Sequence, residues 1–175
     1  MLRSAKFLFI FVLVLLPWVG LKVAEQIPPP PVVVTPPAIS GEELCTPGDQ
    51  DPFVYRSERL PVLRPCLHVT GTVEEFEIAP DGDVHFNVRV DAPYQGLIVE
   101  GNKIAQHGYL VVESVCQVLT VHADVLRLCA SNPDPVANLP QIGDHVWLEG
   151  RYVLDVGHLA WAELHPLYRW GELAK

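Results

Sequence analysis

One predicted hairpin constrains the fold of this chain more than any other sequence feature. Residues 67–78 and 84–91 alternate apolar and polar side chains with a period of two, which is typical of half-buried β-strands. The intervening APDGD segment, residues 79–83, has the Pro-Asp-Gly chemistry of a tight turn. The alternation changes phase near Glu74 and Glu75, which predicts a β-bulge. The sequence therefore predicts a mainly β protein in which these two strands pair.

Three more β-rich segments follow the hairpin. They cover residues 109–115, 143–155 and 160–166, and a long connection over residues 116–140 separates the first of them from the second. Residues 119–128 could form a helix within that connection. Five strands with a long connection between the third and fourth match a five-stranded OB-like barrel, which is the fold class that we expect.

The N-terminal segment predicts attachment to a membrane. Residues 7–21 form an unbroken apolar run after Arg3 and Lys6, and the small residues that follow fit a signal-peptidase site poorly. We therefore expect residues 1–25 to be a transmembrane anchor or uncleaved signal, with cleavage as the alternative. The excess of positive charge before the apolar run places the remaining chain on the periplasmic or extracellular side of the cytoplasmic membrane.

The rest of the chain divides into three regions by composition. Residues 26–39 contain the sequence QIPPPPVVVTPP and predict a Pro-rich linker in an extended polyproline conformation. Residues 40–65 are rich in Gly, Pro and Asp and predict an irregular arm. Residues 66–175 contain all five expected strands and predict the OB-like β-barrel domain.

Cysteine content and charge limit the compartment and the partners. The chain has four cysteines, Cys45, Cys66, Cys116 and Cys129, and an even number in an exported segment indicates two disulfides. The formal net charge of −9 disfavours nucleic acid as a partner, because an acidic surface repels phosphate. The expected partners are the membrane, through the N-terminal helix, and other proteins of a membrane complex.

One short segment near the C-terminus holds the best candidate ligands. Glu163 and His165 are two residues apart on a predicted strand, so both point to the same side as Trp161. With His85 or Glu113 from a neighbouring strand, they could bind a divalent metal. The alternative is that these polar groups bond to the backbone or to arginines while Trp161 covers one end of the barrel. The predicted metal-site residues are His85, Glu113, Glu163 and His165.

Other sequence features favour binding over catalysis. A DGD turn followed by Arg89 and Asp91 is similar to the hairpin of nuclease-like OB barrels, but the spacing of these two residues differs from that of the nucleases. We assign no catalytic residue and no cofactor, and we expect a protein that is not an enzyme. Trp161, Tyr168 and Trp170 are aromatic candidates for an interface with a protein partner.

Several segments together carry a resemblance to a known family. DGDVHF, YLVVESVC, IGDHVWLEGRYVLD and WAELHP resemble the DGD-x-H, VVE-x-x-C, GD-x-V-x-x-x-G-x-Y-V-L-D and W-x-E-x-H-P segments of a poorly characterised family of exported OB-like proteins. The resemblance covers about residues 66–166 and implies an OB-like fold without implying an activity. The family tends to have a second cysteine after VVE-x-x-C, which implies that Cys116 pairs with Cys129 and Cys45 with Cys66.

These observations lead to one expected function and one alternative. We expect a membrane-anchored extracytoplasmic binding module, acting as an accessory or structural subunit of a respiratory, photosynthetic or envelope complex. The alternative is an exported protein that binds a metal or a small ligand, or, less favoured, a metal-dependent hydrolase of nuclease-like OB fold.

Overall fold

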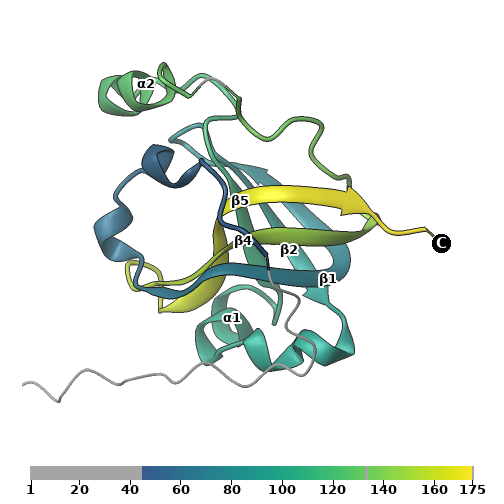
Figure 1. Cartoon of the computed structure of the whole chain (residues 1–175). Coiled ribbons are helices and arrows are strands. Elements are labelled where there is room, and N and C mark those ends of the chain that lie inside the picture. The colour runs from purple at the N-terminus through teal and green to yellow at the C-terminus, as the bar shows by residue number, and fades with distance from the viewer. Residues whose placement is uncertain (1–44, 133, 175) are drawn as a thin grey trace, which may run out of the picture. The chain divides into compact units, whose positions relative to one another are not determined.

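The fold is a five-stranded, mainly β domain, as predicted. The structure is a computed structural model that describes residues 45–132 and 134–174. The strands pair in the order β1-β2-β3-β5-β4, and β4 pairs back onto β1, so the barrel is closed (Figure 1). Only the contact between β3 and β5 is parallel. The strands are β1 (Val62–Ile78), β2 (Val84–Val90), β3 (Leu110–Ser114), β4 (His145–Asp155) and β5 (Trp161–Glu172).

The predicted hairpin of β1 and β2 is confirmed in detail. The strands are antiparallel, and their register shifts between Val73 and Glu75, where the phase change predicted a bulge. Ala79 donates its backbone N–H to Asp83 O at 2.9 Å, which closes the turn. Gly82 has a φ of 91°, a conformation that a side chain would disfavour. The sequence pattern was therefore sufficient to place the paired parts of both strands and their turn.

Two strands are longer than expected. β1 already begins at Val62, inside the region expected to be irregular, and β5 continues to Glu172, beyond the predicted end at residue 166. Both extensions pair with β4, with register shifts between Arg64 and Leu67 on β1 and between Glu149 and Gly150 on β4. These irregularities break the simple alternation of side chains, so the extensions are not evident from periodicity.

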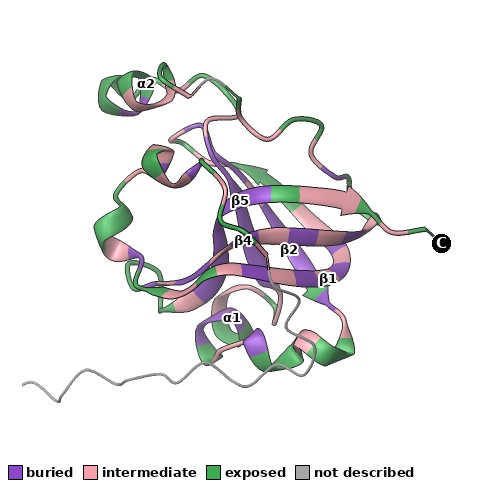
Figure 2. Ribbon diagram, in the orientation of Figure 1, coloured by how far each residue is buried: buried purple, intermediate pink, exposed green. Residues whose placement is uncertain are grey.

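Buried residues lie along all five strands (Figure 2). Their inward-facing apolar side chains form the core. Phe86, Leu148 and Leu164 are among the largest of them, and each is at most 1% exposed. Burial of such a side chain stabilises the folded state by about 1.5–3 kcal/mol relative to its exposure. The barrel interior is therefore a packed apolar core, and polar chemistry is left to the outer faces of the strands.

The helices lie in the connections between the strands. α2 (Ala123–Cys129) falls in the long connection between β3 and β4, where a helix was predicted, but starts later than residue 119. η3 (Ala92–Leu97) and α1 (Glu100–Ala105) lie between β2 and β3, and the sequence did not predict them. α1 has six residues, which is too few for a helical period to be recognised.

The arm packs on the outside of the barrel. Its described part contains η1 (Asp51–Phe53) and η2 (Ser57–Arg59). Val54 and Leu60 are 6% and 3% exposed, and they form a second apolar cluster with Val115 after β3 and Val153 of β4. The arm therefore covers part of the outer face of the sheet.

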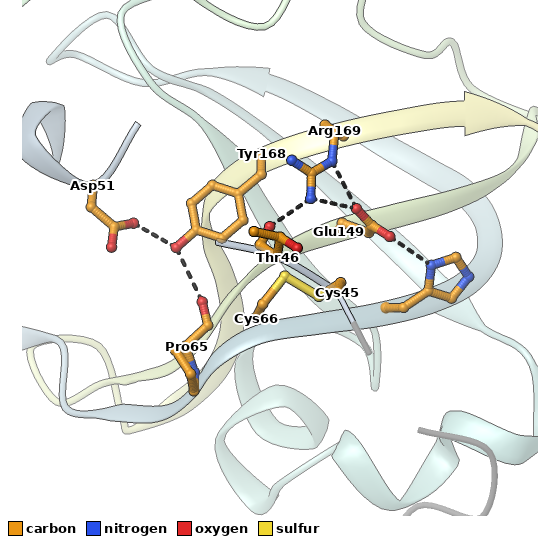
Figure 3. The surroundings of a disulfide bond; sticks show 9 residues. Cys45, Thr46, Asp51, Pro65, Cys66, Glu149, Tyr168 and Arg169 are labelled. Atoms are coloured by element: carbon orange, nitrogen blue, oxygen red, sulfur yellow. Dashed lines mark hydrogen bonds and ion pairs between the residues drawn. A yellow bond between two sulfur atoms is a disulfide. The ribbon is translucent and has the colours of Figure 1, made fainter. Parts of the chain in front are cut away.

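Two disulfides connect the loops to the barrel, with the pairing that the family resemblance implied. Cys45 pairs with Cys66 of β1, and Cys116 pairs with Cys129 of α2. Near the first disulfide, Tyr168 of β5 donates its hydroxyl to Asp51 Oδ1 at 2.6 Å (Figure 3). The start of the arm is thus fixed to the barrel by a covalent bond and by hydrogen bonds.

The N-terminal predictions concern residues that the structure does not describe. The predicted anchor of residues 1–25, the Pro-rich linker of residues 26–39 and the first part of the arm all lie outside residues 45–132 and 134–174. Within those described ranges, no helix combines the length and the apolar character needed to cross a membrane.

Candidate metal centre

A cluster of buried polar side chains lies on the outer face of three neighbouring strands. His165 of β5 is 1% exposed, and its Nδ1 lies 2.9 Å from Glu113 Oε2 of β3 and 3.1 Å from Glu163 Oε1 of β5. Glu113 is 2% exposed and Glu163 is fully buried. One imidazole nitrogen therefore has two carboxylates within hydrogen-bonding distance.

Asp83, directly before β2, completes this cluster. Its Oδ1 accepts a hydrogen bond of 2.8 Å from the backbone N–H of Cys116, while its Oδ2 is buried and has no hydrogen-bond partner. His165 Nε2 is likewise buried without a hydrogen-bond partner. These two atoms lie 3.9 Å apart, beyond hydrogen-bonding distance, and ligand atoms of Asp83, Glu113 and His165 all lie within 4.8 Å of one another.

His85 connects this buried cluster with the surface. Its Nε2 lies 3.3 Å from Glu113 Oε2, and its side chain is 28% exposed. It also lines a pocket of about 540 Å³. The His85 side chain therefore contacts the buried Glu113 carboxylate on one side and lines the pocket on the other.

Strand pairing explains why these residues meet. His85 is opposite Glu113 in the β2–β3 ladder, and Val111 is opposite Glu163 in the parallel β3–β5 ladder. Alternate residues of a strand point to the same face, so Glu113 and Glu163 share the outer face while Val112 and Leu164 enter the core. The parallel contact of β3 with β5 is thus the element of topology that assembles the cluster.

Burial and charge shift the pKa of each member in a definite direction. Burial would lower the pKa of His165, but the charges and hydrogen bonds of Glu113 and Glu163 together outweigh it and raise the pKa to about 10. Burial likewise favours neutral Glu113, yet the charge and hydrogen bond of His165 hold the pKa of Glu113 well below its usual range. Burial raises the pKa of Asp83 to about 7, aided by the charge of Asp81, and burial also raises the pKa of Glu163. The centre of the cluster is an imidazolium–carboxylate pair.

A second polar network lies beside the cluster. Trp161 Nε1 donates to Glu163 Oε2 at 2.8 Å, and the Trp161 ring stacks on His158 with centroids 4.9 Å apart. His158 Nδ1 lies 2.6 Å from Asp155 Oδ2, a buried carboxylate that also forms an ion pair with Arg59 of the arm. A continuous series of contacts therefore connects Arg59 of the arm, through the β4–β5 turn, with Glu163.

The pocket lies on the outer surface beside both networks. Residues of β2 and β3, the β1–β2 turn and the β4–β5 turn contribute to its wall. Trp161 and Phe76 are its large apolar groups, and Glu75, Glu77 and Asp81 supply carboxylates. The pocket is therefore polar with an aromatic wall, and it opens next to His85.

The structure brings together all four residues that the sequence predicted as metal ligands. His85, Glu113, Glu163 and His165 are connected by the contacts described above. The predicted ligand set did not include Asp83, because the turn was the preferred interpretation of the DGD segment. Its position one strand period before His85, on the same side of β2, was a signal that could have identified it.

Other candidates from the sequence are placed differently. Tyr168, a predicted interface residue, is only 6% exposed in the chain, and its hydroxyl donates to Asp51 Oδ1 and to Pro65 O. Trp161 and Trp170 are half-buried. Arg89 Nε donates to Glu74 at 2.7 Å, and Asp91 lies near Thr70 and His145.

Comparison with known proteins gives no match. No protein-family model, no curated protein and no solved structure matches this chain. The chemistry of the site rests on its donor atoms, which are buried carboxylate oxygens and imidazole nitrogens. Such a set can hold a proton, a water molecule or a divalent cation.

Proposed function

We propose that this protein is a membrane-anchored extracytoplasmic binding module of the OB type, and that it acts by binding rather than by catalysis. The strand order β1-β2-β3-β5-β4 and the closed pairing support the OB-like assignment. The two disulfides support an oxidising compartment. The apolar run and the Pro-rich linker support a tether that holds the barrel away from the membrane.

The position of the pocket carries this proposal. OB barrels bind their ligands on the face of strands 2 and 3, between the loop that joins strands 1 and 2 and the loop that joins strands 4 and 5. The pocket of about 540 Å³ is lined by β2, by Val111 of β3, by those two turns and by the adjoining end of β1, with Arg59 and Gln106 at its margin. Its volume also lies within the range of about 300–1,000 Å³ that is common for small-molecule sites.

The pocket lining indicates the class of ligand. Trp161 and Phe76 offer ring surfaces, while Glu75, Asn87 and Gln106 offer hydrogen-bonding groups. Asn87 Nδ2 already donates to Glu75 Oε2 at 2.7 Å and to Gln106 Oε1 at 3.1 Å, so these groups are pre-arranged. Aromatic walls with acceptor oxygens suit a neutral polyhydroxyl or a cationic ligand and disfavour an anion.

Chemical-shift mapping tests the binding function directly. Neutral oligosaccharides and polyamines are titrated into the 15N-labelled domain, and we expect shifts that cluster on Asn87, Gln106 and the Trp161 indole. Asn87→Ala should weaken binding, while Trp170→Phe, outside this pocket, serves as the matched control. If neither class of probe shifts these resonances, the pocket is not a binding site of the proposed kind.

A second candidate function is that of an accessory subunit in a membrane protein complex. Leu119 and Val121, in the connection before α2, are 93% and 92% exposed. The disulfide of Cys116 and Cys129 closes the loop that presents them. Exposed apolar side chains on a constrained loop favour a protein partner.

Native separation after mild-detergent extraction tests the accessory-subunit function. The full-length protein should migrate in a complex, and Leu119→Ser with Val121→Ser should release it. Val62→Ser, at another exposed apolar position, is the control and should leave the complex intact. Migration of the wild-type protein alone as a monomer would exclude this second function.

A further inference from the structure

We propose that Asp83, Glu113 and His165 bind one divalent transition-metal cation of the Zn²⁺ or Mn²⁺ class at the junction of β2, β3 and β5. This site goes beyond the proposed pocket function and does not depend on it. The three residues are 2%, 2% and 1% exposed, so the cation would be enclosed by protein. Their ligand atoms lie within 4.8 Å of one another.

The distance between the two unpaired atoms fits one shared cation. Two ligand atoms bound at about 2.1 Å from a single Zn²⁺ ion cannot be more than about 4.2 Å apart. Asp83 Oδ2 and His165 Nε2 lie 3.9 Å apart, which is inside this limit. Small rotations of the carboxylates would bring the third ligand from within 4.8 Å to the same centre.

The lack of hydrogen bonds at these two atoms is an independent indication of a ligand. Asp83 Oδ2 and His165 Nε2 are buried and have no hydrogen-bond partner. An unsatisfied buried polar atom costs about 1–3 kcal/mol, so two of them facing each other are not expected without a compensating interaction. A cation between them would satisfy both lone pairs at once.

The opposite nitrogen of His165 is held as in known metal-binding histidines. A ligating histidine almost always donates its second ring N–H to a carboxylate or carbonyl, which fixes the ring and its tautomer. His165 Nδ1 lies 3.1 Å from Glu163 Oε1 and 2.9 Å from Glu113 Oε2. His165 Nδ1 thus has two acceptors. If the Glu113 carboxylate rotates to bind the cation, Nδ1–H can still donate a hydrogen bond to Glu163. Glu163 is then a positioning residue, and Trp161 Nε1 fixes it in turn at 2.8 Å.

The charge of the cluster also favours a divalent ion. Asp83 and Glu113 together neutralise the two positive charges of the ion. Ionising three carboxylates together in a region of low dielectric constant is costly, and a divalent cation bound between them offsets that cost. A ligating imidazole nitrogen carries no proton, so His165 releases the proton of Nε2 when the cation binds.

The donor types select among the common metals. One imidazole nitrogen with carboxylate oxygens suits Zn²⁺, Mn²⁺ or Fe²⁺. Ca²⁺ requires about six to eight oxygen ligands, and this cluster has too few. Thiophilic Cu⁺ is disfavoured because all four cysteines are in disulfides.

The pocket gives the cation a path to the site. Asp81, Glu77 and Glu75 line it and would attract cations, while His85 stands between it and Glu113. Rotation of the His85 side chain would open the cluster to the pocket. The DGDVH segment therefore supplies Asp81 at the pocket, Asp83 as a buried ligand and His85, whose side chain separates the pocket from the buried cluster.

Equilibrium dialysis of the purified full-length protein against Zn²⁺ and Mn²⁺, followed by metal analysis, tests the proposal. We expect one ion per chain for the wild-type protein. Asp83→Asn and His165→Gln should weaken binding by more than the roughly 10–100-fold expected for loss of a residue that only orients a ligand. Glu163→Gln should fall within that range. His107→Gln, at an exposed histidine outside the cluster, is the control and should keep the stoichiometry.

A direct observation of His165 keeps the test valid if a buried substitution prevents folding. Long-range 1H–15N spectra of the wild-type protein report both ring nitrogens, and Zn²⁺ should shift His165 Nε2 while Nδ1 stays protonated. The proposal is overturned if the wild-type protein binds no stoichiometric ion, or if Zn²⁺ leaves His165 unchanged. It is equally overturned if folded Asp83→Asn protein binds as tightly as the wild type. Failure of the oligosaccharide and polyamine titrations would leave these results unaffected.

Discussion

Asn102 of α1 forms two hydrogen bonds with the backbone of Ala162 in β5. Its Oδ1 accepts from Ala162 N–H, and its Nδ2 donates to Ala162 O, both at 2.8 Å. The same Nδ2 group also donates to Tyr109 O at 2.8 Å. The side-chain amide of Asn102 therefore pairs with the N–H and the C=O of one β5 residue, as the backbone of a neighbouring strand would. Asn102 is fully buried, so water cannot replace these hydrogen bonds.

Asn102→Ala should be strongly destabilising. The substitution leaves the N–H and C=O of Ala162 buried and unpaired, at a cost of about 1–3 kcal/mol for each group. Urea denaturation should therefore show a free energy of unfolding lower by about 2–5 kcal/mol. Lys103→Ala, on the same helix but exposed, is the control and should change it by less than about 0.5 kcal/mol. Equal effects of the two variants would contradict this role.

Gly101→Ala should disturb the contact between α1 and the β4–β5 turn. A methyl group at Gly101 would lie 2.5 Å from Leu159 O and 2.6 Å from Trp161 N, which are backbone atoms that cannot rotate away. Overpacking of this kind costs about 1–3 kcal/mol. A lower thermal midpoint with altered Trp161 fluorescence would be the expected result. Gly108→Ala serves to compare steric effects, because its Cβ would meet no atom within 4 Å, although its φ of 81° adds strain.

Removal of the Cys45–Cys66 disulfide should loosen the arm before the barrel. In Cys45→Ser with Cys66→Ser, the start of the arm keeps only non-covalent contacts, such as the hydrogen bonds of Tyr168 (Figure 3). Hydrogen exchange should increase over residues 46–60 while β2 and β3 stay protected. A uniform increase over the whole domain would show instead that the arm and the barrel unfold as one unit.

The stability of the domain should depend on Asp91 at acidic pH. Partial burial acts to raise the pKa of Asp91, but hydrogen bonds from Thr70 and His145 outweigh it and hold the pKa below its usual range. Because the folded state binds this proton less tightly than the unfolded state, the contribution is present above about pH 4 and is lost as the pH falls through the folded pKa. Denaturation at pH 6 and pH 3 should show a smaller difference for Asp91→Asn than for the wild type. An unchanged difference would assign acid sensitivity to other carboxylates.

The sequence predicted most of the barrel because its strands alternate cleanly. The β1–β2 hairpin, its bulge and its turn follow from a period of two and from the APDGD segment. The same period placed Glu163 and His165 on one face of β5. The local sequence pattern was sufficient to predict the position and direction of side chains within a single strand or hairpin.

Contacts between segments that are distant in the sequence could not be predicted from local periodicity. The meeting of Glu113 with Glu163 depends on the parallel contact of β3 with β5, which no local pattern encodes. Asp83 is buried partly because Cys116 N–H binds its Oδ1, and Cys116 belongs to another loop. α1 was missed for a similar reason, since its six residues are stabilised by the contacts of Asn102 and not by a helical period.

The Cys45–Cys66 disulfide also determines how the domain bears mechanical load. Any force applied to the chain before Cys45, as from a tether, passes through the sulfur–sulfur bond directly into β1. The arm between these cysteines is a covalent side loop and carries none of that tension. The contacts of Val54 and Leu60 with the barrel would therefore persist under pulling, and the first structure to resist would be the ladder between β1 and β4.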